Sequence, residues 1–154
     1  MLREGEKAPY FKLVGIDEKG LEREISIEEF RGKKVILYFY PKDNTPGCTK
    51  EACSFRDNLE EINKKGAVVV GVSKDSIKSH FNFKNKYNLN FYLLSDPDCK
   101  VAEAYKVCSE KTRGGKVKKG VVRSTFIIDE EGIIKKAFYN VKVEGHVKEV
   151  LKYL

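Results

Sequence analysis

The chain has 154 residues, of which 41% are hydrophobic and 34% are charged, a composition typical of a folded domain that excludes a disordered chain. No stretch approaches the roughly 18 apolar residues of a membrane span, so we expect no membrane segment. The formal net charge is +7, but the lysines are spread along the chain, and we interpret them as a solvated surface without a nucleic-acid partner.

Hydrophobic patterning predicts strands that alternate with helices. Short apolar runs rich in β-branched and aromatic residues predict buried strands, and the longer segments between them have helical spacing. In chain order we expect a hairpin of residues 10–16 and 21–25, a helical turn at 27–30, a strand at 35–40, a helix from 45 to about 65, a strand at 67–72, a helix at 76–87, a strand at 91–94, a helix from 96 to about 105, a hairpin of strands at 124–129 and 133–138, and a final helix at 145–154.

This order predicts an α/β fold with a mixed central β-sheet, helices on its flanks and an N-terminal β-hairpin. Strands joined through helices are expected to be parallel, and the closing hairpin adds antiparallel ones. Residues 111–119 are basic and contain Gly114-Gly115, and we interpret them as a mobile loop. We find no linker or repeat, so we expect residues 1–154 to form a single domain.

The helix that follows the strand at 35–40 has clear end signals. Thr45 is a natural N-cap, and Pro46 suits the first helical position. Gly66 suits the position just beyond the C-terminus of the helix. The loop before this helix lies at the carboxyl end of a strand, where open α/β sheets usually bind ligands.

Four cysteines are present, at positions 48, 53, 99 and 108. None of their spacings matches the paired C-x2-C of a zinc site, and both histidines are distant in sequence, so we expect no metal and no other cofactor. Residues 1–6 have no apolar core of the kind that a signal peptide needs, so we expect a cytoplasmic protein. In a reducing cytosol these cysteines should not be permanent crosslinks.

Cys48 is the strongest candidate for a reactive residue. It falls in the first turn of the predicted helix, where free backbone N–H groups and the helix dipole favour a thiolate, which is the nucleophilic form. Gly47 would let a small substrate approach the backbone closely. The alternative is a buried structural cysteine that happens to lie near a helix start.

The spacing of Cys48 and Cys53 has a mechanical consequence. In an intact helix their Cα atoms would be roughly 8–9 Å apart. A disulfide needs a separation below about 7 Å. The two residues could therefore bond only if the first turns of the helix unwind, as a catalytic cycle allows and a permanent crosslink does not.

The segment that contains Cys48 resembles the active-site motif of peroxiredoxins, Pro-x-x-x-Thr-x-x-Cys, which here is formed by Pro41, Thr45 and Cys48. Its continuation, Thr-Pro-Gly-Cys-Thr-x-Glu-Ala, is similar to the bacterioferritin comigratory protein subfamily, also called the Q type. The resemblance covers nearly the whole chain in the right order. It continues in residues 55–57, 71–75, 94–98, 101–105 and 123–129.

The resemblance implies a thioredoxin-like fold and a role for each matching residue. Cys48 would be the peroxidatic cysteine, which attacks the peroxide and becomes a sulfenic acid. The Thr45 hydroxyl would contact the thiolate and the peroxide oxygen, and Arg123 would support the thiolate and polarise the peroxide. Pro41 would shield the pocket, and Glu51 would orient the arginine.

The resemblance also implies the rest of the cycle. Cys53 would be the resolving cysteine, which forms an intramolecular disulfide with Cys48, and thioredoxin or a similar dithiol protein would reduce that disulfide. The substrates would be hydrogen peroxide and organic hydroperoxides, and the enzyme would serve antioxidant defence and cell redox homeostasis. We expect a monomer, with a dimer as the alternative.

Four remaining side chains lie outside the motif. We interpret Cys99 and Cys108 as packing residues, with Cys99 mildly reactive in the first turn of its helix. If that helix is regular, the two cysteines lie at its opposite ends and should not pair. His80 and His146 are expected to be structural or exposed and not catalytic.

Three other classes of function compete with peroxide reduction. Dithiol–disulfide exchange without peroxide could use Cys48 and Cys53, but the C-x4-C spacing and the accompanying Pro41, Thr45 and Arg123 argue against it. A copper-delivery or other metal-binding module would need a third soft ligand. A basic chaperone or nucleic-acid binder would show salt-dependent binding that survives Cys48→Ser.

Overall fold

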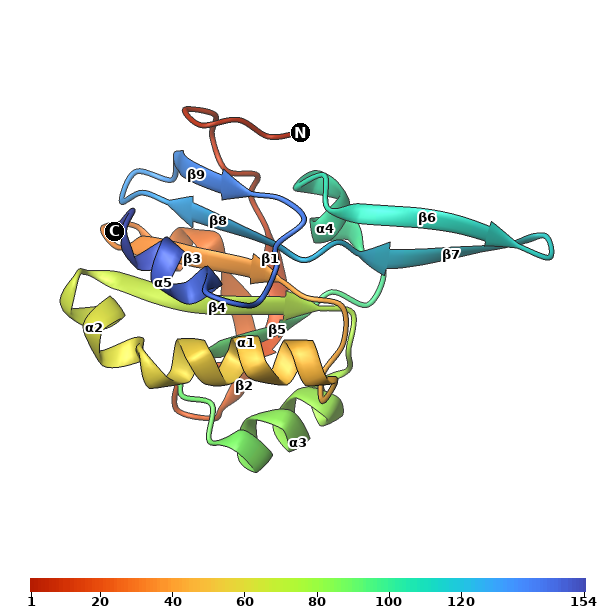
Figure 1. Cartoon of the computed structure of the whole chain (residues 1–154), viewed down its shortest axis with the longest axis horizontal. Coiled ribbons are helices and arrows are strands. Elements are labelled where there is room, and N and C mark those ends of the chain that lie inside the picture. Colours follow the sequence, from red (N-terminus) through yellow and green to blue (C-terminus); the bar gives the residue numbers. More distant parts are fainter.

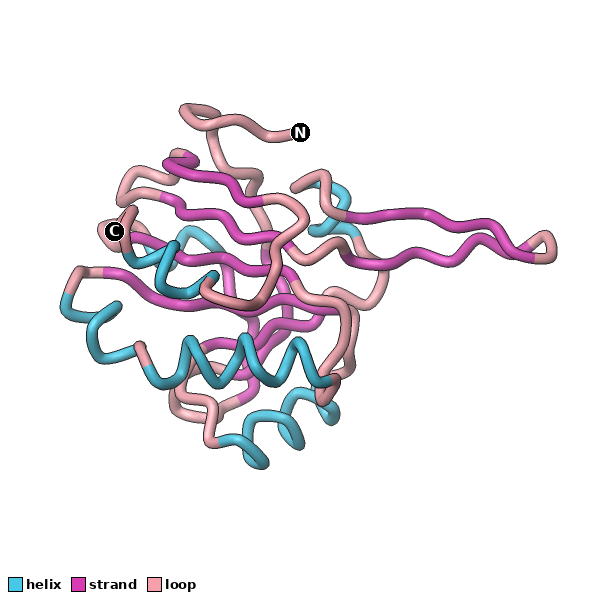
Figure 2. The backbone as a smooth tube through the Cα atoms, viewed as in Figure 1, coloured by secondary structure: helices cyan, strands magenta, loops and turns pink.

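The computed structural model describes residues 1–154 and is built around a seven-stranded mixed sheet with helices on both faces, as Figure 1 and Figure 2 show. A separate two-stranded hairpin extends from one end of the sheet. The elements in chain order are β1 (Lys12–Ile16), β2 (Glu22–Ser26), the 3-10 turn η1 (Ile27–Phe30), β3 (Lys34–Phe39), α1 (Pro46–Asp57), α2 (Leu59–Lys64), β4 (Ala67–Ser73), α3 (Ile77–Tyr87), β5 (Tyr92–Ser95), α4 (Lys100–Ala104), β6 (Cys108–Arg113), β7 (Lys116–Val121), β8 (Ser124–Ile128), β9 (Ile134–Phe138) and α5 (His146–Leu151).

The order of the strands in the main sheet is β2-β1-β5-β4-β3-β8-β9. The central strands β3, β4 and β5 are parallel, whereas β1, β2, β8 and β9 add antiparallel pairs at the two sides. This arrangement confirms the predicted α/β class, the N-terminal hairpin and the mixed sheet. It also places the carboxyl ends of β3, β4 and β5 along one edge.

The two faces of β3 are buried in two different cores. Because side chains alternate along a strand, Leu37 packs into a core with η1 and α4, while Ile36 packs into a core with α1, α2, α3 and α5. Phe55 of α1 and Ile62 of α2 are fully buried in the second core. Helices α1 and α5, which cover the second core, lie in front of the sheet in Figure 1. Burial on both faces explains why residues 35–40 are a continuous apolar run.

The prediction of one helix from 45 to about 65 is wrong. The helix breaks at Asn58, whose side-chain amide donates to the Ser54 carbonyl at 2.8 Å and competes with the helical pattern there. The second helical segment, α2, then continues to Lys64, and Gly66 follows with a φ of +77°. The break leaves α1 as a separate helix that begins beside Cys48.

The prediction of a mobile loop at residues 111–119 is also wrong. These residues belong to strands β6 and β7, which pair from Cys108↔Val121 to Arg113↔Lys116. Gly114 and Gly115 have φ values of +55° and +80°, so they form the two-residue turn that this kind of hairpin requires. The glycine pair is therefore a hairpin signal that the surrounding lysines concealed. None of the helices has the length and apolar composition needed to cross a membrane.

Candidate active site

Cys48 lies where the sequence placed it, in the first turn of α1. The loop after β3 leads into Pro46, which occupies the start of the helix, and Cys48 is the third helical residue. Its side chain belongs to the core between the sheet and the helices, and the residue is 1% exposed. Backbone N–H groups at a helix start have no helical acceptor, so the thiol lies in a positive local field.

Arg123 connects this thiol to a buried carboxylate. Its Nη2 donates to Cys48 Sγ at 3.4 Å, and its Nη1 donates to Glu51 Oε1 at 2.7 Å. Burial acts to lower the pKa of Arg123, but the charges of Glu51 and Cys48 outweigh it, so the guanidinium pKa is raised. The arginine is thus held as a cation against the sulfur although the two residues are 75 positions apart.

Glu51 is held in an unusual state. The residue is 1% exposed, and burial raises the pKa of its carboxyl group to about 7, although Arg123 acts in the opposite direction. Its second oxygen, Oε2, has no hydrogen-bond partner, and neither has the buried hydroxyl of Tyr38. The Glu51–Arg123 pair therefore changes its charge near neutral pH.

Gly47 is required for the approach of Arg123. A Cβ atom at this position would lie 3.2 Å from Nη2 of Arg123, the same nitrogen that donates to Cys48. A side chain there would crowd the guanidinium, which would have to shift by a few tenths of an ångström. The glycine thus serves the arginine, whereas the sequence had suggested that it serves the approach of the substrate.

Thr45 occupies the N-cap position of α1, as predicted, although its side chain makes no capping hydrogen bond. Its hydroxyl donates instead to the Lys42 carbonyl at 2.8 Å and closes the turn in which Asn44 adopts a φ of +62°. Pro41, predicted to shield the pocket, is exposed on the same loop. The proposed contacts of both residues with peroxide stay predictions.

Cys53 lies five residues further along α1, between one and two helical turns from Cys48, and is partly exposed. The helix is continuous from Pro46 to Asp57, and both thiols are free. Regular helix geometry puts the two Cα atoms roughly 8–9 Å apart, beyond the ~7 Å limit for a disulfide. This is the reduced form of the pair, and disulfide formation requires α1 to unwind.

A buried hydrogen-bond network that the sequence did not reveal anchors the loop before α1. Asp43 of this loop lies 2.7 Å from His80 Nδ1, and it accepts hydrogen bonds from Tyr40 Oη at 2.6 Å and from Ser79 Oγ at 2.9 Å. The other ring nitrogen of His80 lies 2.9 Å from the Leu94 carbonyl. His80 is therefore structural, as expected. A polar residue in a loop and a histidine 37 positions later carried no signal of their pairing.

His146 also has a structural environment. It is buried, and its Nε2 lies 2.8 Å from the Thr125 hydroxyl. Burial lowers the pKa of His146 to about 4, so its ring is neutral at physiological pH.

Cys99 and Cys108 do not lie at opposite ends of one regular helix, so the placement expected for them is wrong, although both thiols are free. Helix α4 has only five residues, and after it the chain turns back, with the Val107 amide donating to the Ala102 carbonyl at 2.8 Å. This turn brings the Cys108 thiol beside that of Cys99. Burial, followed by the interaction with Cys108, raises the pKa of Cys99 to about 12. The burial of Cys99 and its raised pKa both argue against the mild reactivity expected from the sequence.

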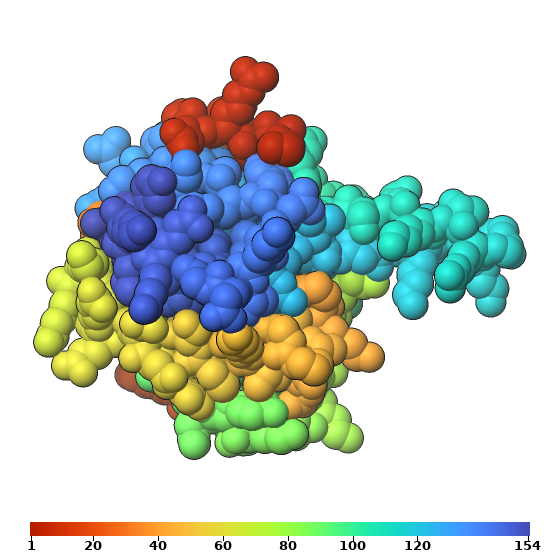
Figure 3. All heavy atoms as spheres, in the orientation of Figure 1, coloured from red at the N-terminus to blue at the C-terminus, as the bar shows by residue number.

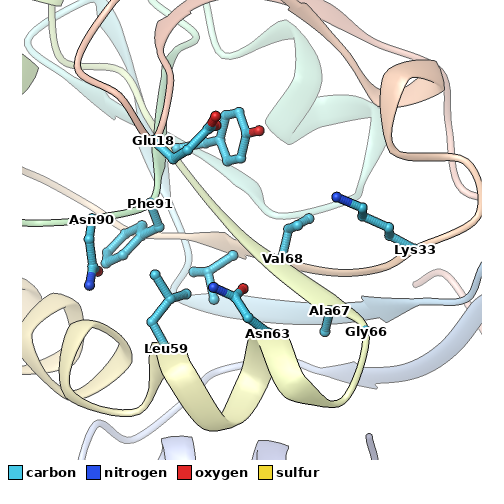
Figure 4. A pocket seen from close by; sticks show the side chains of 11 residues that line it. Glu18, Lys33, Leu59, Asn63, Gly66, Ala67, Val68, Asn90 and Phe91 are labelled. Atoms are coloured by element: carbon cyan, nitrogen blue, oxygen red, sulfur yellow. The ribbon is translucent and has the colours of Figure 1, made fainter.

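A pocket of about 290 Å³ lies at the amino-terminal ends of the parallel strands, opposite the end that carries Cys48. Figure 4 shows its lining side chains. Leu59 and Asn63 of α2, Phe91 before β5 and Ala67 at the start of β4 are among its lining residues. It contains no cysteine and none of the residues predicted for the site. The amino-terminal edge of the sheet is therefore separate from the Cys48 site.

Comparisons with known proteins identify the family of the chain. The AhpC/TSA family profile matches residues 5–137. A Coxiella burnetii protein named bcp is 56% identical over 147 residues, which is 96% of this chain and 95% of that protein. Peroxiredoxin Bcp of Bacillus subtilis is 47% identical over 150 residues, which is 97% of this chain and 93% of that protein.

A solved structure of peroxiredoxin Q from Xylella fastidiosa superimposes with a TM-score of 0.87 at 35% identity and covers 99% of this chain and 94% of its own. A structure of the Xanthomonas campestris bacterioferritin comigratory protein, described in terms of alkyl peroxide reduction, gives a TM-score of 0.81 at 41% identity and covers 91% of this chain and 88% of its own.

A mixed sheet of this topology, with a cysteine at the start of the helix that follows β3, defines a thiol-dependent redox enzyme of the thioredoxin-like class. The chain belongs to the AhpC/TSA family, and its relatives are peroxiredoxins of the Bcp, or Q, type. It is a thiol-dependent peroxidase, an oxidoreductase that acts on peroxide at the expense of a thiol reductant.

Proposed function

We propose that Cys48 is the residue that reduces the peroxide. Its thiolate attacks one peroxide oxygen, the O–O bond breaks, and the other oxygen leaves as water or an alcohol after taking up a proton. Cys48 is oxidised to a sulfenic acid. The observation that carries this assignment is the contact of 3.4 Å between Arg123 Nη2 and Cys48 Sγ, because no other cysteine of the chain accepts a hydrogen bond from an arginine.

Arg123 acts on both the thiolate and the peroxide in this proposal. A guanidinium offers several fixed donors, so one N–H can bind Cys48 while the others face the oxygens on which charge develops. Glu51 is a positioning residue, since it contacts Arg123 and not the sulfur. Thr45 would contact the peroxide after its hydroxyl leaves the Lys42 carbonyl, and Pro41 would limit the access of water.

Cys53 completes the oxidation as the resolving thiol. Its sulfur attacks the sulfenic sulfur of Cys48, a disulfide forms, and the hydroxyl leaves as water. The length of the intact helix between the two residues means that the first turns of α1 unwind in this step. The oxidised enzyme is therefore expected to be locally unfolded around residues 46–53.

A dithiol protein of the thioredoxin type then reduces this disulfide by exchange. The substrates proposed are hydrogen peroxide and organic hydroperoxides, and the role is antioxidant defence and redox homeostasis. We place this cycle in the cytoplasm, where dithiol proteins are kept reduced. We further propose that residues 1–154 act as one domain and that the active form is a monomer.

Peroxide consumption with thioredoxin, thioredoxin reductase and NADPH tests the proposal. Cys48→Ser should abolish turnover. Cys53→Ser should oxidise once, release one equivalent of water or alcohol, and then stop with thioredoxin as the reductant. Cys108→Ser is the matched control, because it removes a partly exposed thiol outside the site. Full turnover by Cys48→Ser would refute the assignment of Cys48.

A further inference from the structure

The hairpin formed by β6 and β7 has two chemically different faces. Because side chains alternate along a strand, Lys111 and Arg113 lie on the same face, opposite Lys118 and Lys116 in the pairing of the two strands. The other face carries a mixture of acidic, polar, apolar and basic residues, namely Glu110, Thr112, Val117 and Lys119. Four cations are thus gathered on one side of a hairpin that projects from the body of the molecule (Figure 3).

The cationic face borders a cleft that reaches the active-site loop. The cleft has a volume of about 830 Å³, and Val121 is the only one of its lining residues with a large apolar side chain apart from Pro41. Pro41 and Lys42, from the loop that leads to Cys48, form the opposite wall. The lining also includes Lys74, Asp75, Ser109, Lys111, Arg113, Lys118, Lys119 and Gly120.

The charges of the cleft are mostly unneutralised. Its single acidic residue, Asp75, is already engaged, since it accepts hydrogen bonds from the Asp43 amide at 2.8 Å and from Ser73 Oγ at 2.6 Å. Lys119 pairs with Glu103. Lys42, Lys111, Arg113 and Lys118 take part in none of the ion pairs of the structure.

The hairpin itself is destabilised by this arrangement. Lys111 is directly opposite Lys118, and Arg113 is directly opposite Lys116. Like charges at directly opposed positions destabilise a strand pair. A hairpin selected only for stability would place unlike charges there, so the arrangement favours an anionic partner that relieves the repulsion.

We propose that this cleft is the docking site for the acidic surface of the dithiol protein that reduces the oxidised enzyme. The inference rests on the proposed function, because a thiol peroxidase must accept a peroxide and a protein reductant in turn. The cleft is far larger than a peroxide group needs, and most of its lining residues are charged or polar. Its wall at Pro41 and Lys42 belongs to the loop next to the helix that must unwind.

Docking of this kind acts mainly on the rate of association. Opposite potentials steer diffusional encounter, and the effect decreases as salt screens exposed charges. The reaction of the oxidised enzyme with an acidic thioredoxin should therefore depend strongly on ionic strength. The reaction of Cys48 with hydrogen peroxide, which is neutral, should not depend on the hairpin.

The test compares two double variants of equal charge change. Lys111→Glu with Arg113→Glu reverses the face, and because it places unlike charges opposite Lys118 and Lys116 the hairpin is expected to remain folded. Lys33→Glu with Lys65→Glu reverses two exposed lysines at the amino-terminal edge of the sheet, far from Cys48. For each protein, kcat/KM for an acidic thioredoxin and for uncharged dithiothreitol is measured at low and high salt, together with the rate of Cys48 oxidation.

The hairpin variant should lose about 10-fold or more in kcat/KM for thioredoxin at low salt, and the difference should shrink at high salt. The lysine control should stay within about 2-fold, and both variants should keep wild-type rates with dithiothreitol and peroxide. Equal values of kcat/KM for thioredoxin in all three proteins would overturn the docking proposal. So would an unchanged thioredoxin rate in a hairpin variant that has lost binding of a labelled single-stranded DNA, which would assign the cleft to nucleic acid. A wild type that cannot oxidise Cys48 with peroxide would refute the proposed function instead.

Discussion

The molecule contains two pairs of cysteines, and they differ in almost every respect except that both are reduced. Cys99 and Cys108 are neighbours in space, whereas Cys48 and Cys53 are separated by an intact helix. Burial and its thiol neighbour raise the pKa of Cys99 to about 12, so that thiol is protonated at physiological pH. Cys48 is equally buried, but it accepts a hydrogen bond from the guanidinium of Arg123.

In the proposed function, a cationic donor beside the sulfur, and not the distance between two thiols, decides which pair reacts with peroxide. A thiolate is the nucleophile, and Cys48 is the only one of the four cysteines whose sulfur accepts a hydrogen bond from a cationic side chain. We propose that the pair whose thiols lie side by side is the unreactive one. The pair that must unwind a helix to form a disulfide is the one proposed for catalysis.

Removing the cation beside Cys48 should cause the largest loss of Cys48 reactivity. Arg123→Met should lower the second-order rate constant for Cys48 oxidation by hydrogen peroxide by about 10²–10³-fold, the usual cost of losing a donor aimed at developing charge. Arg123→Lys should recover only part of the rate, because an ammonium cannot contact the sulfur and the peroxide in the same fixed geometry. Stopped-flow measurement of single-turnover oxidation checks both values. A full rate in Arg123→Met would contradict the electrostatic explanation.

Neutralising Glu51 should have a smaller effect that depends on pH. The pKa of Glu51 is raised to about 7 by burial, so the carboxyl group is mostly protonated below pH 7 and ionised above it. The ionised form holds Arg123 more firmly, and the oxidation rate should therefore rise as the pH increases through about 7. In Glu51→Gln this step should disappear, with a rate a few-fold below wild type at pH 8 and close to wild type at pH 6.

The same shift predicts a change in stability of known sign. Because the folded-state pKa of Glu51 lies above its ordinary value of 4.5, the folded protein binds this proton more tightly than the unfolded chain does. Its contribution to stability is present below about pH 4.5 and is lost as the pH rises through about 7. The Tm difference between Glu51→Gln and wild type should thus grow in favour of the variant over that range. A difference independent of pH would show that the carboxyl group does not titrate there.

Changing the second cysteine pair should have the smallest effect. Cys99→Ser and Cys108→Ser should each leave the oxidation rate within about 2-fold of wild type, since neither thiol contacts the charged groups around Cys48. Cys99→Ser should lower the free energy of unfolding by ~1–3 kcal/mol, because it buries a hydroxyl in an apolar core. Denaturant titration and the same stopped-flow assay separate these two outcomes. A large loss of rate in either variant would mean that this pair takes part in the cycle.

Much of the fold followed from local patterns in the sequence. The apolar run at 35–40 and the end signals at Thr45 and Pro46 located β3 and the start of α1, because burial on both faces and a proline at the first helical turn leave a local signature. The break at Asn58 and the β6–β7 hairpin were missed. In both places a polar or basic sequence gave little hydrophobic signal, and a side-chain hydrogen bond or a pair of glycines decided the structure.

The candidate site was also only partly predictable from the sequence. Cys48 could be identified from its position at a helix start, and the family resemblance pointed to Arg123 and Glu51, which the fold does bring into contact. The pairing of Asp43 with His80 depends on how the strands and α3 pack, and no local pattern encodes it. The approach of Cys108 to Cys99 likewise depends on the turn after α4.

The most direct test of the central claim is to find which thiols are oxidised by one equivalent of hydrogen peroxide. After rapid alkylation and trypsin digestion, Cys48 and Cys53 fall in separate peptides, residues 43–50 and 51–56, while Cys99 and Cys108 fall in others. We expect a disulfide that links the first two peptides, and we expect Cys99 and Cys108 to be recovered as alkylated thiols. Recovery of a Cys99–Cys108 disulfide, with Cys48 still alkylated, would contradict it.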